Sequence, residues 1–544
     1  MNTGRRAWLA AAATLPLWGC ERPAVSASYG GGWVGAEAER GHRLRDLESG
    51  LLPAPVTQRR AGVLVVGAGI AGLAAARALN QAGVDDVQVF DLEDAPGGNS
   101  RGHTMAGMGC PLGAHYLPVP GERAVEVIAL LEEFGLRRTE RGQPVYDERH
   151  LCHSPQERLF IGAQWHEGLL PPLDALPVEQ RASTQAQYRQ FSAAVRRLSE
   201  GGAFSMPTAR SAWRPELAAL DAVPFAQWLD AQGLVAPALR WYLDYCCSDD
   251  YGAGARQVSA WAGVHYFASR HGFHAPGDTN EERDGVFTWP EGNAWISRRL
   301  ARALGERLRT GRIALRVSEG RLETSVDFWN VREHHVERWA APQVVLAVPL
   351  FVAARLLEAP PPALTQAVAA MRHAPWLVAN LQLDQALDDR PGAPPSWDNV
   401  VYDASPGPGA ATLGYVDVMH QSTRPHPGPT VLTAYWALGG DSAAQLLAQR
   451  ARLLYEPWSS WAQAVVSDVA RVHPDLPHKL EQVDLMRYGH AMSIPVPGLR
   501  GCAALRALAA PQRSVQFAHS DLSGYSVFEE ALYQGTRAGV AAKR

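Results

Sequence analysis

The sequence predicts an α/β fold in which a parallel sheet lies between two outer layers, interleaved with a second domain of α+β type. Three observations in one short stretch predict the sheet. Residues 63–66 form a continuous apolar run, as expected of a parallel strand that is buried on both faces. A glycine-rich turn leads into a helical pattern over residues 73–80, and residues 87–91 form a second apolar strand. Strand, turn, helix and strand in this order make one unit of a three-layer parallel sheet.

The turn between these two strands has the spacing Gly67-x-Gly69-x-x-Gly72. The first glycine permits the tight turn, the second lets the backbone approach a pyrophosphate, and the third lets the helix pack on the strand. Amide groups at the helix N-terminus then face the phosphate charge. Asp91 ends the second strand, where its carboxylate can accept hydrogen bonds from an adenosine ribose. The stretch therefore predicts a Rossmann-type domain that binds a dinucleotide.

Length and composition exclude several classes of protein. A chain of 544 residues is several times the usual domain size, so more than one domain is expected. The apolar fraction of 47% and the charged fraction of 19% are typical of a globular chain. A net charge of -4 gives no basic field for nucleic acid, so no nucleic-acid partner is expected. Six cysteines without a CxxC pair predict neither a disulfide framework nor a metal site.

The N-terminus resembles a bacterial export signal. Arg5 and Arg6 precede about a dozen apolar residues, a stretch too short to span a bilayer. The paired arginines resemble a twin-arginine signal, and the segment that ends at Cys20 resembles a lipobox, which would make this cysteine the lipidated first residue. We therefore expect an export signal over residues 1–20, a tether over residues 21–57, and a periplasmic protein held to the membrane by its lipid. A cleaved signal without lipid and an N-terminal helix that only anchors are the alternatives.

Residues 91–101 resemble a segment of the flavin amine oxidase and phytoene desaturase superfamily, in which an acid, a loop, two glycines and an arginine follow one another. Four later segments resemble the same superfamily in the same order: residues 111–116, 287–293, 344–349 and 517–539. The resemblance implies an amine oxidase-like fold and FAD as the cofactor. It also implies an oxidoreductase that transfers hydride from its substrate to N5 of the flavin.

The resemblance further implies how FAD is held. Arg101 grips the phosphates, residues 113–115 pass the isoalloxazine ring, and Asp521 contacts the ribityl-phosphate region. The superfamily usually has a glycine directly before this acid, whereas His519 and Ser520 stand there in this chain, and the alternative is that Asp521 caps the following helix. Motif and resemblance together imply these cofactor contacts: Gly67, Gly69, Ile70, Ala71, Gly72, Asp91, Leu92, Gly98, Asn99, Arg101, Gly113, Ala114, His115, Val317, Asp521 and Val527.

The same segments divide the chain between two interleaved domains. The FAD-binding domain is expected to comprise residues 58–116, 283–360 and 500–544, and the substrate domain residues 117–282 and 361–499. Apolar periodicity predicts helices between residues 120 and 240, and β-branched residues predict strands at 377–383 and 431–436.

Two positions near the C-terminus are candidates for the reacting face of the flavin. Monoamine oxidase-like members place one residue near the flavin edge and enclose the substrate between two aromatic side chains. By resemblance His490 takes the first position, as a hydrogen-bonding wall residue or alternatively as a covalent flavin link. Ala491 stands where one aromatic is found, and Tyr525 matches the other. His490 and Tyr525 are therefore the candidate catalytic residues, with only half of the aromatic cage predicted.

Residues 241–252 alternate aromatic and acidic side chains. Such a set suits a cationic amine, through cation–π contact and charge neutralisation. The alternative is a helix end in which Asp249 and Asp250 are solvated and the aromatic residues belong to the core. The residues alone leave both interpretations open.

The chain contains only two lysines, Lys479 and Lys543, and neither lies between Pro290 and Pro349. Many amine oxidases of the superfamily hold a lysine there that assists reoxidation of the flavin by oxygen. Arginine does not substitute for it, because its guanidinium keeps its proton. The electron acceptor is therefore expected to be either oxygen or another acceptor that the sequence does not identify.

These observations predict an FAD-dependent oxidoreductase of the cell envelope that takes hydride from the carbon next to an unprotonated amine. One alternative is a flavin dehydrogenase, desaturase or isomerase that acts on C–C bonds of an apolar small molecule, which the missing lysine and Ala491 favour. Another is a non-catalytic envelope protein that holds FAD. No second glycine motif for NADH is evident, which disfavours a pyridine-nucleotide oxidoreductase.

Overall fold

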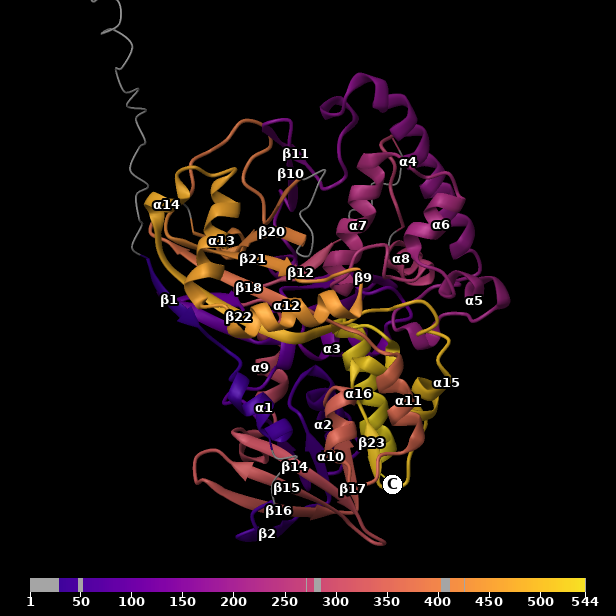
Figure 1. Cartoon of the computed structure of the whole chain (residues 1–544), viewed down its shortest axis with the longest axis vertical. Helices are drawn as coiled ribbons and strands as arrows, with labels where there is room; N and C mark the ends of the chain where they lie inside the picture. The colour runs from indigo at the N-terminus through magenta and orange to yellow at the C-terminus, as the bar shows by residue number, and fades with distance from the viewer. Residues whose placement is uncertain are drawn as a thin grey trace, which may run out of the picture.

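The computed structural model describes residues 29–46, 52–270, 272–277, 285–402, 411–424 and 426–543. Figure 1 shows a lower part, which contains a five-stranded parallel sheet, and an upper part built on an eight-stranded sheet. The predicted export signal, with Arg5, Arg6 and Cys20, lies outside the described residues.

The sheet of the lower part is parallel throughout and contains both predicted strands. Its order is β13 (Leu308–Arg309), β4 (Val87–Phe90), β3 (Val63–Val66), β17 (Gln343–Leu346) and β23 (Val515–Phe517). All four residues of β3 are buried, as its apolar run predicts. The chain returns to this sheet after long excursions into the upper part, so residues far apart in sequence meet at its edge.

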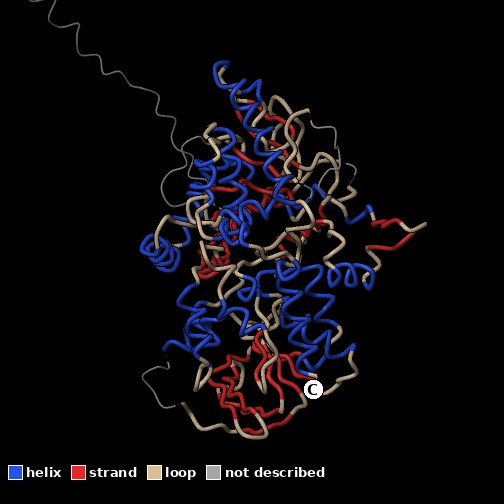
Figure 2. The backbone as a smooth tube through the Cα atoms, turned by 90° about the vertical axis from the view of Figure 1, so that its right-hand side faces the viewer, coloured by secondary structure: helices blue, strands red, loops and turns tan. Residues whose placement is uncertain are grey.

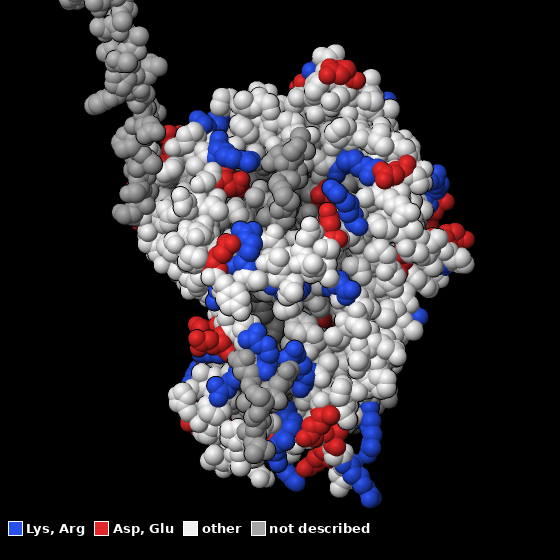
Figure 3. All heavy atoms as spheres, viewed as in Figure 1, with Lys and Arg blue, Asp and Glu red and all other residues white. Residues whose placement is uncertain are grey.

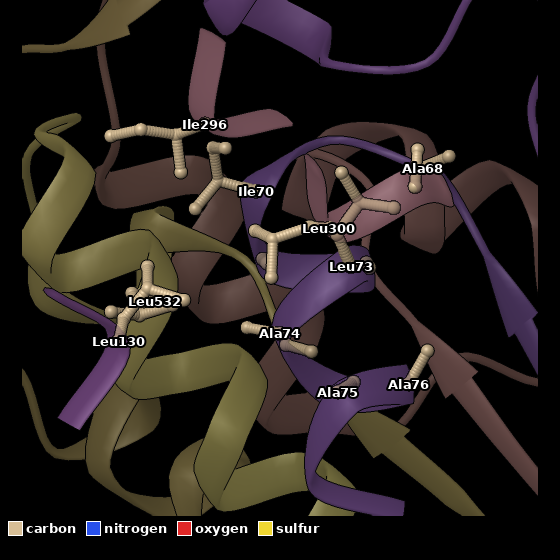
Figure 4. Close-up of a cluster of buried hydrophobic side chains, with 14 of the residues drawn as sticks. Ala68, Ile70, Leu73, Ala74, Ala75, Ala76, Leu130, Ile296, Leu300 and Leu532 are labelled. Atoms are coloured by element: carbon tan, nitrogen blue, oxygen red, sulfur yellow. The ribbon is translucent and has the colours of Figure 1, made fainter. Parts of the chain in front are cut away.

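Different layers cover the two faces of the parallel sheet. One face is covered by α2 (Ile70–Gln81), α3 (Val125–Glu133), α9 (Ala294–Arg302) and α16 (Phe528–Ala542), whose apolar side chains form one core cluster (Figure 4). The other face packs on a sheet of β14 (Arg312–Glu319), β15 (Thr324–Asn330), β16 (His335–Ala341) and β2 (Thr57–Arg60), and on α10 (Leu350–Leu356), α11 (Pro362–Ala370) and α15 (Ala503–Ala509). Figure 2 shows strands at the base of this part with helices above them. The predicted three-layer α/β fold is confirmed, with one outer layer built partly of strands.

Helix α16 packs very close to α2 because two glycines of α16, Gly535 and Gly539, face α2. A Cβ atom at Gly535 would lie 2.1 Å from the carbonyl oxygen of Ala71, and one at Gly539 would lie 2.4 Å from that of Ala75. Since no side chain fits at these distances, the two helix backbones are in direct contact over one turn. This contact places the start of α16 beside the turn that precedes α2.

The upper part is built on a mixed sheet. Its order is β1 (Gly30–Trp33), β22 (Leu480–Ser493), β18 (His373–Leu383), β21 (Thr430–Ala437), β20 (Ala411–Asp417), β19 (Asp398–Val401), β10 (Glu157–Ile161) and β11 (Gln164–Glu167). The helices of this part are α4 (Val178–Ser199), α5 (Pro215–Asp221), α6 (Phe225–Ala231), α7 (Pro237–Tyr251), α8 (Ala260–Ala268), α12 (Ala443–Tyr455), α13 (Trp458–Ala470) and α14 (Leu476–Lys479). The strands predicted at 377–383 and 431–436 are β18 and β21.

Short antiparallel pairs complete the fold. β7 (Tyr116–Pro118) pairs with β12 (Val286–Thr288), β5 (Gly102–Met105) with β6 (Met108–Pro111), and β8 (Arg137–Glu140) with β9 (Gln143–Tyr146). The first of these pairs joins two segments that both pass the site described below.

The tether predicted over residues 21–57 is wrong for the portion that the structure describes. Gly30–Trp33 forms β1, which pairs in parallel with β22, and Ala38–Asp46 forms α1. The glycines suggested a linker, but β pairing uses backbone groups alone. Gly31 has a φ of +130°, and a Cβ atom there would lie 1.9 Å from the carbonyl oxygen of Val483. Glycine is therefore required for the close pairing of this strand.

The surface carries both signs of charge. On the face shown in Figure 3, acidic and basic groups are scattered between wide areas of other residues. The described cysteines are all free.

Within the described ranges, no helix combines the length and the apolar character needed to cross a bilayer.

Candidate active site

Two adjoining cavities are lined by residues from both parts of the molecule. The glycine cavity is lined by Gly67, Gly69 and Gly98, among others, and the acidic cavity by a set that includes Asp249 and Glu529. The residues that line both cavities mark where they meet: Asn99, Ala114, Tyr488, Ala491, Ser526, Val527 and Phe528.

The turn before α2 has the shape that a dinucleotide requires. Gly67 has a φ of +100°, and a Cβ atom at Gly72 would lie 1.8 Å from the carbonyl oxygen of Gly67. Gly69 lines the cavity, and a Cβ atom there would have only the Cα atom of Gly98 within 4 Å, at 3.7 Å. A side chain at position 69 would therefore project into the cavity. The N-terminus of α2 begins at the next residue, which suits a phosphate.

Asp91 lines the glycine cavity at the end of β4, as predicted for a ribose contact. Its Oδ2 accepts a hydrogen bond from the Ala68 N–H at 2.8 Å, and its Oδ1 accepts one from the Glu93 N–H at 2.9 Å. Burial raises the pKa of this carboxyl group, and the two backbone donors oppose that rise. The carboxylate thus braces the glycine turn, and each oxygen keeps a second acceptor position for a ligand hydroxyl.

Arg101 also lines this cavity and is 8% exposed. Its Nε donates to the carbonyl oxygen of Gly98 at 3.0 Å, and its Nη1 lies 3.9 Å from Oε1 of Glu93. The guanidinium is therefore held at the wall, with further donors available for an anionic group. Glycine turn, helix N-terminus, carboxylate and guanidinium together fit the pyrophosphate and ribose of FAD.

Most of the predicted cofactor contacts line one of the two cavities. The glycine cavity takes Gly67, Gly69, Ile70, Ala71, Asp91, Leu92, Gly98, Asn99, Arg101, Ala114 and Val527. Gly113 and His115 line the acidic cavity instead. Gly72 serves the packing of α2 against the turn.

The acidic cavity has carboxyl groups on one side and aromatic rings around it. Asp249 and Asp250 come from the end of α7, Glu529 from the start of α16, and Arg270 from the segment after α8. Arg270 Nη2 lies 3.1 Å from Oδ2 of Asp250, and the hydroxyl of Tyr116 donates to Oδ2 of Asp249 at 3.4 Å. The ring walls are Tyr116, Trp376, Tyr435, Tyr488 and Phe528. The interpretation of Asp249 and Asp250 as solvated groups at a helix end is therefore wrong.

Burial changes the ionisation of this cavity. It raises the pKa of Asp249 to about 7, helped by the neighbouring Asp250, and it raises the pKa of Glu529 to about 7 against the opposing charge of Arg270. His115 stacks on Tyr435 with ring centroids 4.4 Å apart, and burial lowers its pKa to about 3. His115 is therefore neutral at physiological pH, whereas the two carboxyl groups are poised to ionise.

His490 lines the glycine cavity near the place where the two cavities meet. The residue is exposed to solvent, yet the surrounding protein and the nearby Arg450 guanidinium lower its pKa below the ordinary value. The ring lies against Phe351 at a centroid distance of 4.7 Å. This is the position of a neutral wall residue.

Tyr525 does not occupy the predicted position on the reacting face. Its side chain is 1% exposed and belongs to the core cluster of α7 and α8, where its hydroxyl lies 3.3 Å from the sulfur of Met206 and 3.4 Å from Nδ1 of His265. Val527, two residues later, lines both cavities together with Ala491. The chain turns at Gly524, which has a φ of +86°, so that Tyr525 enters the core. The aromatic residues that line both cavities are Tyr488 and Phe528, and neither predicted cage position, 491 or 525, places an aromatic ring there.

The prediction for Val317 is also wrong. Val317 is fully buried in the core beneath the parallel sheet, and its carbonyl accepts from the Glu358 N–H. Its segment approaches the nucleotide end earlier, at Gly311 and Arg312, whose N–H groups donate to the carbonyl oxygens of Glu93 and Asp91 at 2.9 and 2.8 Å. The predicted contact at Val317 therefore lies several residues too far along β14, which begins at Arg312.

Asp521 is fully buried and lies behind the glycine cavity, which His519 and Ser520 line in its place. Its Oδ2 accepts from the Leu350 N–H at 2.9 Å, at the first residue of α10, and its Oδ1 lies 3.1 Å from Nε2 of His373. Although burial opposes it, His519 and His373 hold the pKa of Asp521 well below its ordinary value. The carboxylate caps α10, not the helix that follows it in sequence, and it positions the wall of the cavity.

Sequence reasoning missed Glu529 and Arg270. Both Glu529 and Glu530 stand in the first turn of α16, where acids are common because they complement the helix dipole. Nothing in that local pattern distinguishes an acid that lines a cavity from one that faces solvent. Arg270 follows α8 without a motif of its own.

Comparisons with known proteins agree with this geometry. The family described as flavin containing amine oxidoreductase matches residues 70–542. A solved putrescine oxidase with bound putrescine is 18% identical, with a TM-score of 0.62 over 89% of this chain and 99% of that chain. Cyclohexylamine oxidase from Brevibacterium oxydans IH-35A is 18% identical, with a TM-score of 0.61 over 89% of this chain and 98% of that chain. A fatty acid isomerase from P. acnes is 14% identical, with a TM-score of 0.57 over 88% and 97%. These structures support the fold alone, and no curated protein matches significantly.

Proposed function

The chain belongs to the flavin-containing amine oxidoreductase family and is an FAD-dependent oxidoreductase, and from this premise we propose that it oxidises a small amine. The observation that carries the proposal is the acidic cavity, which adjoins the glycine cavity at Ala491 and Val527. Asp249 and Glu529 make no ion pair with any described basic residue, so the complement of this cavity is a cation. The putrescine and cyclohexylamine oxidases of the same fold act on such compounds by their names.

In this proposal the glycine cavity binds FAD and the acidic cavity binds the substrate. The glycine turn, Asp91 and Arg101 hold FAD, which when bound supplies the acceptor for a hydride. Ala491 and Val527 present small apolar side chains where the two cavities meet, against which a substrate carbon can pack. The acidic cavity has a volume of about 140 Å³, which suits a small molecule, since an engineered cavity of about 150 Å³ in another protein holds benzene.

Anaerobic addition of amines to the FAD-loaded protein tests the proposal. We expect a primary alkylamine to bleach the visible absorbance of the flavin, and tert-butylamine to leave it unchanged because this amine has no hydrogen on the carbon next to nitrogen. If no amine bleaches the flavin, amine oxidation is not the function.

A second candidate function is the conversion of C–C bonds in an apolar substrate. It is favoured by Ala491, which by resemblance stands where amine oxidases present an aromatic ring and which lines both cavities. Bleaching by an isoprenoid or an unsaturated fatty acid, with none by amines, would select this candidate.

We also propose that the protein is exported and anchored by lipid at Cys20, on the evidence of Arg5, Arg6 and the apolar segment that follows them. Replacing both arginines with lysine should retain the precursor in the cytoplasm, because the twin-arginine route reads that pair. Cys20→Ala should release the mature protein from the membrane fraction. Continued membrane association of this variant would exclude the lipid anchor.

The electron acceptor is proposed to be oxygen or a second, separate acceptor. Within the described residues neither cavity is lined by lysine, and Lys479 pairs with Asp388 and Asp475 instead. Comparing the reoxidation of the substrate-reduced protein by oxygen and by an artificial acceptor decides between them.

A further inference from the structure

We propose that the acidic cavity binds a second cationic group of the substrate, so that the preferred substrates are short diamines or amines that carry another fixed positive charge. The inference rests on the proposed function, since it concerns the same cavity. It specifies which end of the amine the carboxyl groups hold and which residues hold it.

The first argument is the balance of charge. Three carboxyl groups line the acidic cavity, those of Asp249, Asp250 and Glu529, and one guanidinium, that of Arg270. Arg270 is committed to Asp250, at 3.1 Å. When the other two carboxyl groups ionise, the lining has an excess of two negative charges, which favours a ligand that places a cationic group beside them.

Glu529 supplies the second argument. Its side chain is 5% exposed and lines the cavity, and it makes no ion pair with the described residues, although its own backbone N–H and the charge of Arg270 favour its ionised form. The N-terminus of α16 stabilises an acid in its first turn by about 0.3–1 kcal/mol. The penalty for burying an unpaired charge amounts to several kcal/mol, so the helix dipole alone does not account for this carboxylate. A cationic ligand group would.

The third argument is position. The carboxyl groups belong to the acidic cavity alone, whereas Ala114, Ala491 and Val527 line both cavities. The reacting carbon must therefore lie at the shared wall, whereas the carboxyl groups line only the acidic cavity. Hydride leaves that carbon only when the attached nitrogen has lost its proton, and a pair of carboxylates stabilises the protonated form. The acids consequently suit a nitrogen that stays protonated and does not react.

The rings between the two ends complete the site. Trp376, Tyr435 and Phe528 line the acidic cavity and offer apolar contact to a methylene chain. Tyr116, which donates to Asp249, adds an aromatic face beside the acids. A short chain with one nitrogen at the shared wall and one at the acids fits this arrangement.

Binding of a redox-inert pair tests the cation site without any turnover. The full-length FAD-loaded protein is titrated by calorimetry with tert-butylamine, a cation, and with tert-butanol, its neutral analogue of similar shape. We expect the amine to bind at least about 10-fold more tightly, and Glu529→Gln or Asp249→Asn to reduce that ratio by about 10-fold. Glu179→Gln, on the exposed first turn of α4, is the matched control and should leave the ratio unchanged. Equal binding of the two probes to the wild type, or an unchanged ratio in both Glu529→Gln and Asp249→Asn, would overturn the proposal. Flavin content and melting temperature confirm that each variant is folded.

Anaerobic flavin reduction by 1,4-diaminobutane and by pentylamine, a chain of the same length with a methyl group in place of the second amine, tests the second charge. We expect the diamine to be preferred by at least about 10-fold in the wild type and the preference to fall in Glu529→Gln. Equal reduction by both overturns the inference and leaves amine oxidation standing. Reduction by neither removes the proposed function, while the calorimetric ratio still decides whether the cation site exists.

Discussion

The two cavities differ in what forms their walls. One side of the glycine cavity is formed by backbone and small residues of the turn before α2 and the loop after β4, with Asp91 and Arg101 held by backbone groups of these two segments. Residues 347–349 and the segments around Ala491 and Val527 form the rest of its wall. The acidic cavity is formed by charged and aromatic side chains from α7, β18, β21 and α16, four elements that are well separated in the sequence. The glycine turn and its contacts with Asp91 and Arg101 are therefore set by two neighbouring segments, whereas the acidic cavity depends entirely on how distant segments meet.

The largest effect on the difference between the two cavities is expected from a side chain that fills the glycine cavity. Gly69 has φ and ψ of -70° and 179°, which valine adopts without strain, so Gly69→Val changes only the space available to the cofactor. We expect FAD affinity to fall by far more than 10-fold, or roughly 1.4 kcal/mol as a lower limit, and the protein to be purified without flavin. The flavin-to-protein ratio measures the effect.

Gly121→Val is the control for this variant, because a Cβ atom there would meet nothing within 4 Å. It should retain FAD. A yellow Gly69→Val protein with the wild-type ratio would remove the glycine turn from the cofactor site.

Tyr525 does not line the acidic cavity, so its variants test where that cavity ends. Because its ring is buried among α7 and α8, Tyr525→Ala should destabilise the protein by about 3–5 kcal/mol, through lost burial and the cavity left behind. Tyr525→Phe keeps the ring and should cost about 1 kcal/mol, the value of one hydrogen bond. Denaturant unfolding measures both.

In the same preparations, the calorimetric preference for tert-butylamine over tert-butanol should not change, since Tyr525 does not line the acidic cavity. A stable Tyr525→Ala protein whose amine-driven flavin reduction is lost would restore this residue to the reacting face.

The smallest expected effect is the response to pH, which only the acidic cavity should show. Asp249 and Glu529 have pKa values raised to about 7. The charged or titratable groups that act on them include Asp250, Arg270, Tyr116, Glu157, Asp398 and Glu530. A cation binds the ionised carboxylates, so its affinity should rise by about 10-fold from about pH 6 to about pH 8 for each group that must ionise. FAD affinity should change little over this range.

Stability without ligand should change in the opposite direction. The folded-state pKa of Glu529 lies above its ordinary value of about 4.3, so the unfolded chain loses the proton first as the pH rises. The stability that this group contributes is therefore present below about pH 4 and is lost as the pH rises to about 7. Glu529→Gln should remove that part of the dependence, which a series of melting temperatures would reveal. A pH-independent cation affinity would show that the carboxyl groups are not the ligands.

Several features of the site could be predicted because they are set within a few residues. The turn from Gly67 to Gly72, the ribose position of Asp91 and the approach of Arg101 all depend on backbone conformation and hydrogen bonds over short distances. Such interactions do not require knowledge of the remaining fold. The same holds for β3, whose apolar run is buried wherever a parallel sheet forms around it.

The failures have equally specific causes. Tyr525 and Val527 are two residues apart, and only the turn at Gly524 and the packing of α16 on α2 decide which of them faces the cavities. Gly30–Trp33 resembles a linker in sequence and becomes a strand because β22 offers it unpaired backbone groups. In both cases the deciding contact lies with a distant segment.

The sequence by itself determined that this chain binds a dinucleotide in an α/β fold, because glycine spacing and apolar runs act through local geometry. Only the tertiary structure decided the chemistry of the substrate cavity. Asp249 belongs to α7 and Glu529 to α16, and their carboxyl groups share one cavity with Arg270 because the chain passes through the upper part and then returns to the parallel sheet. Burial at that meeting place, which no short pattern encodes, is what raises the pKa of both acids and leaves them without a basic partner.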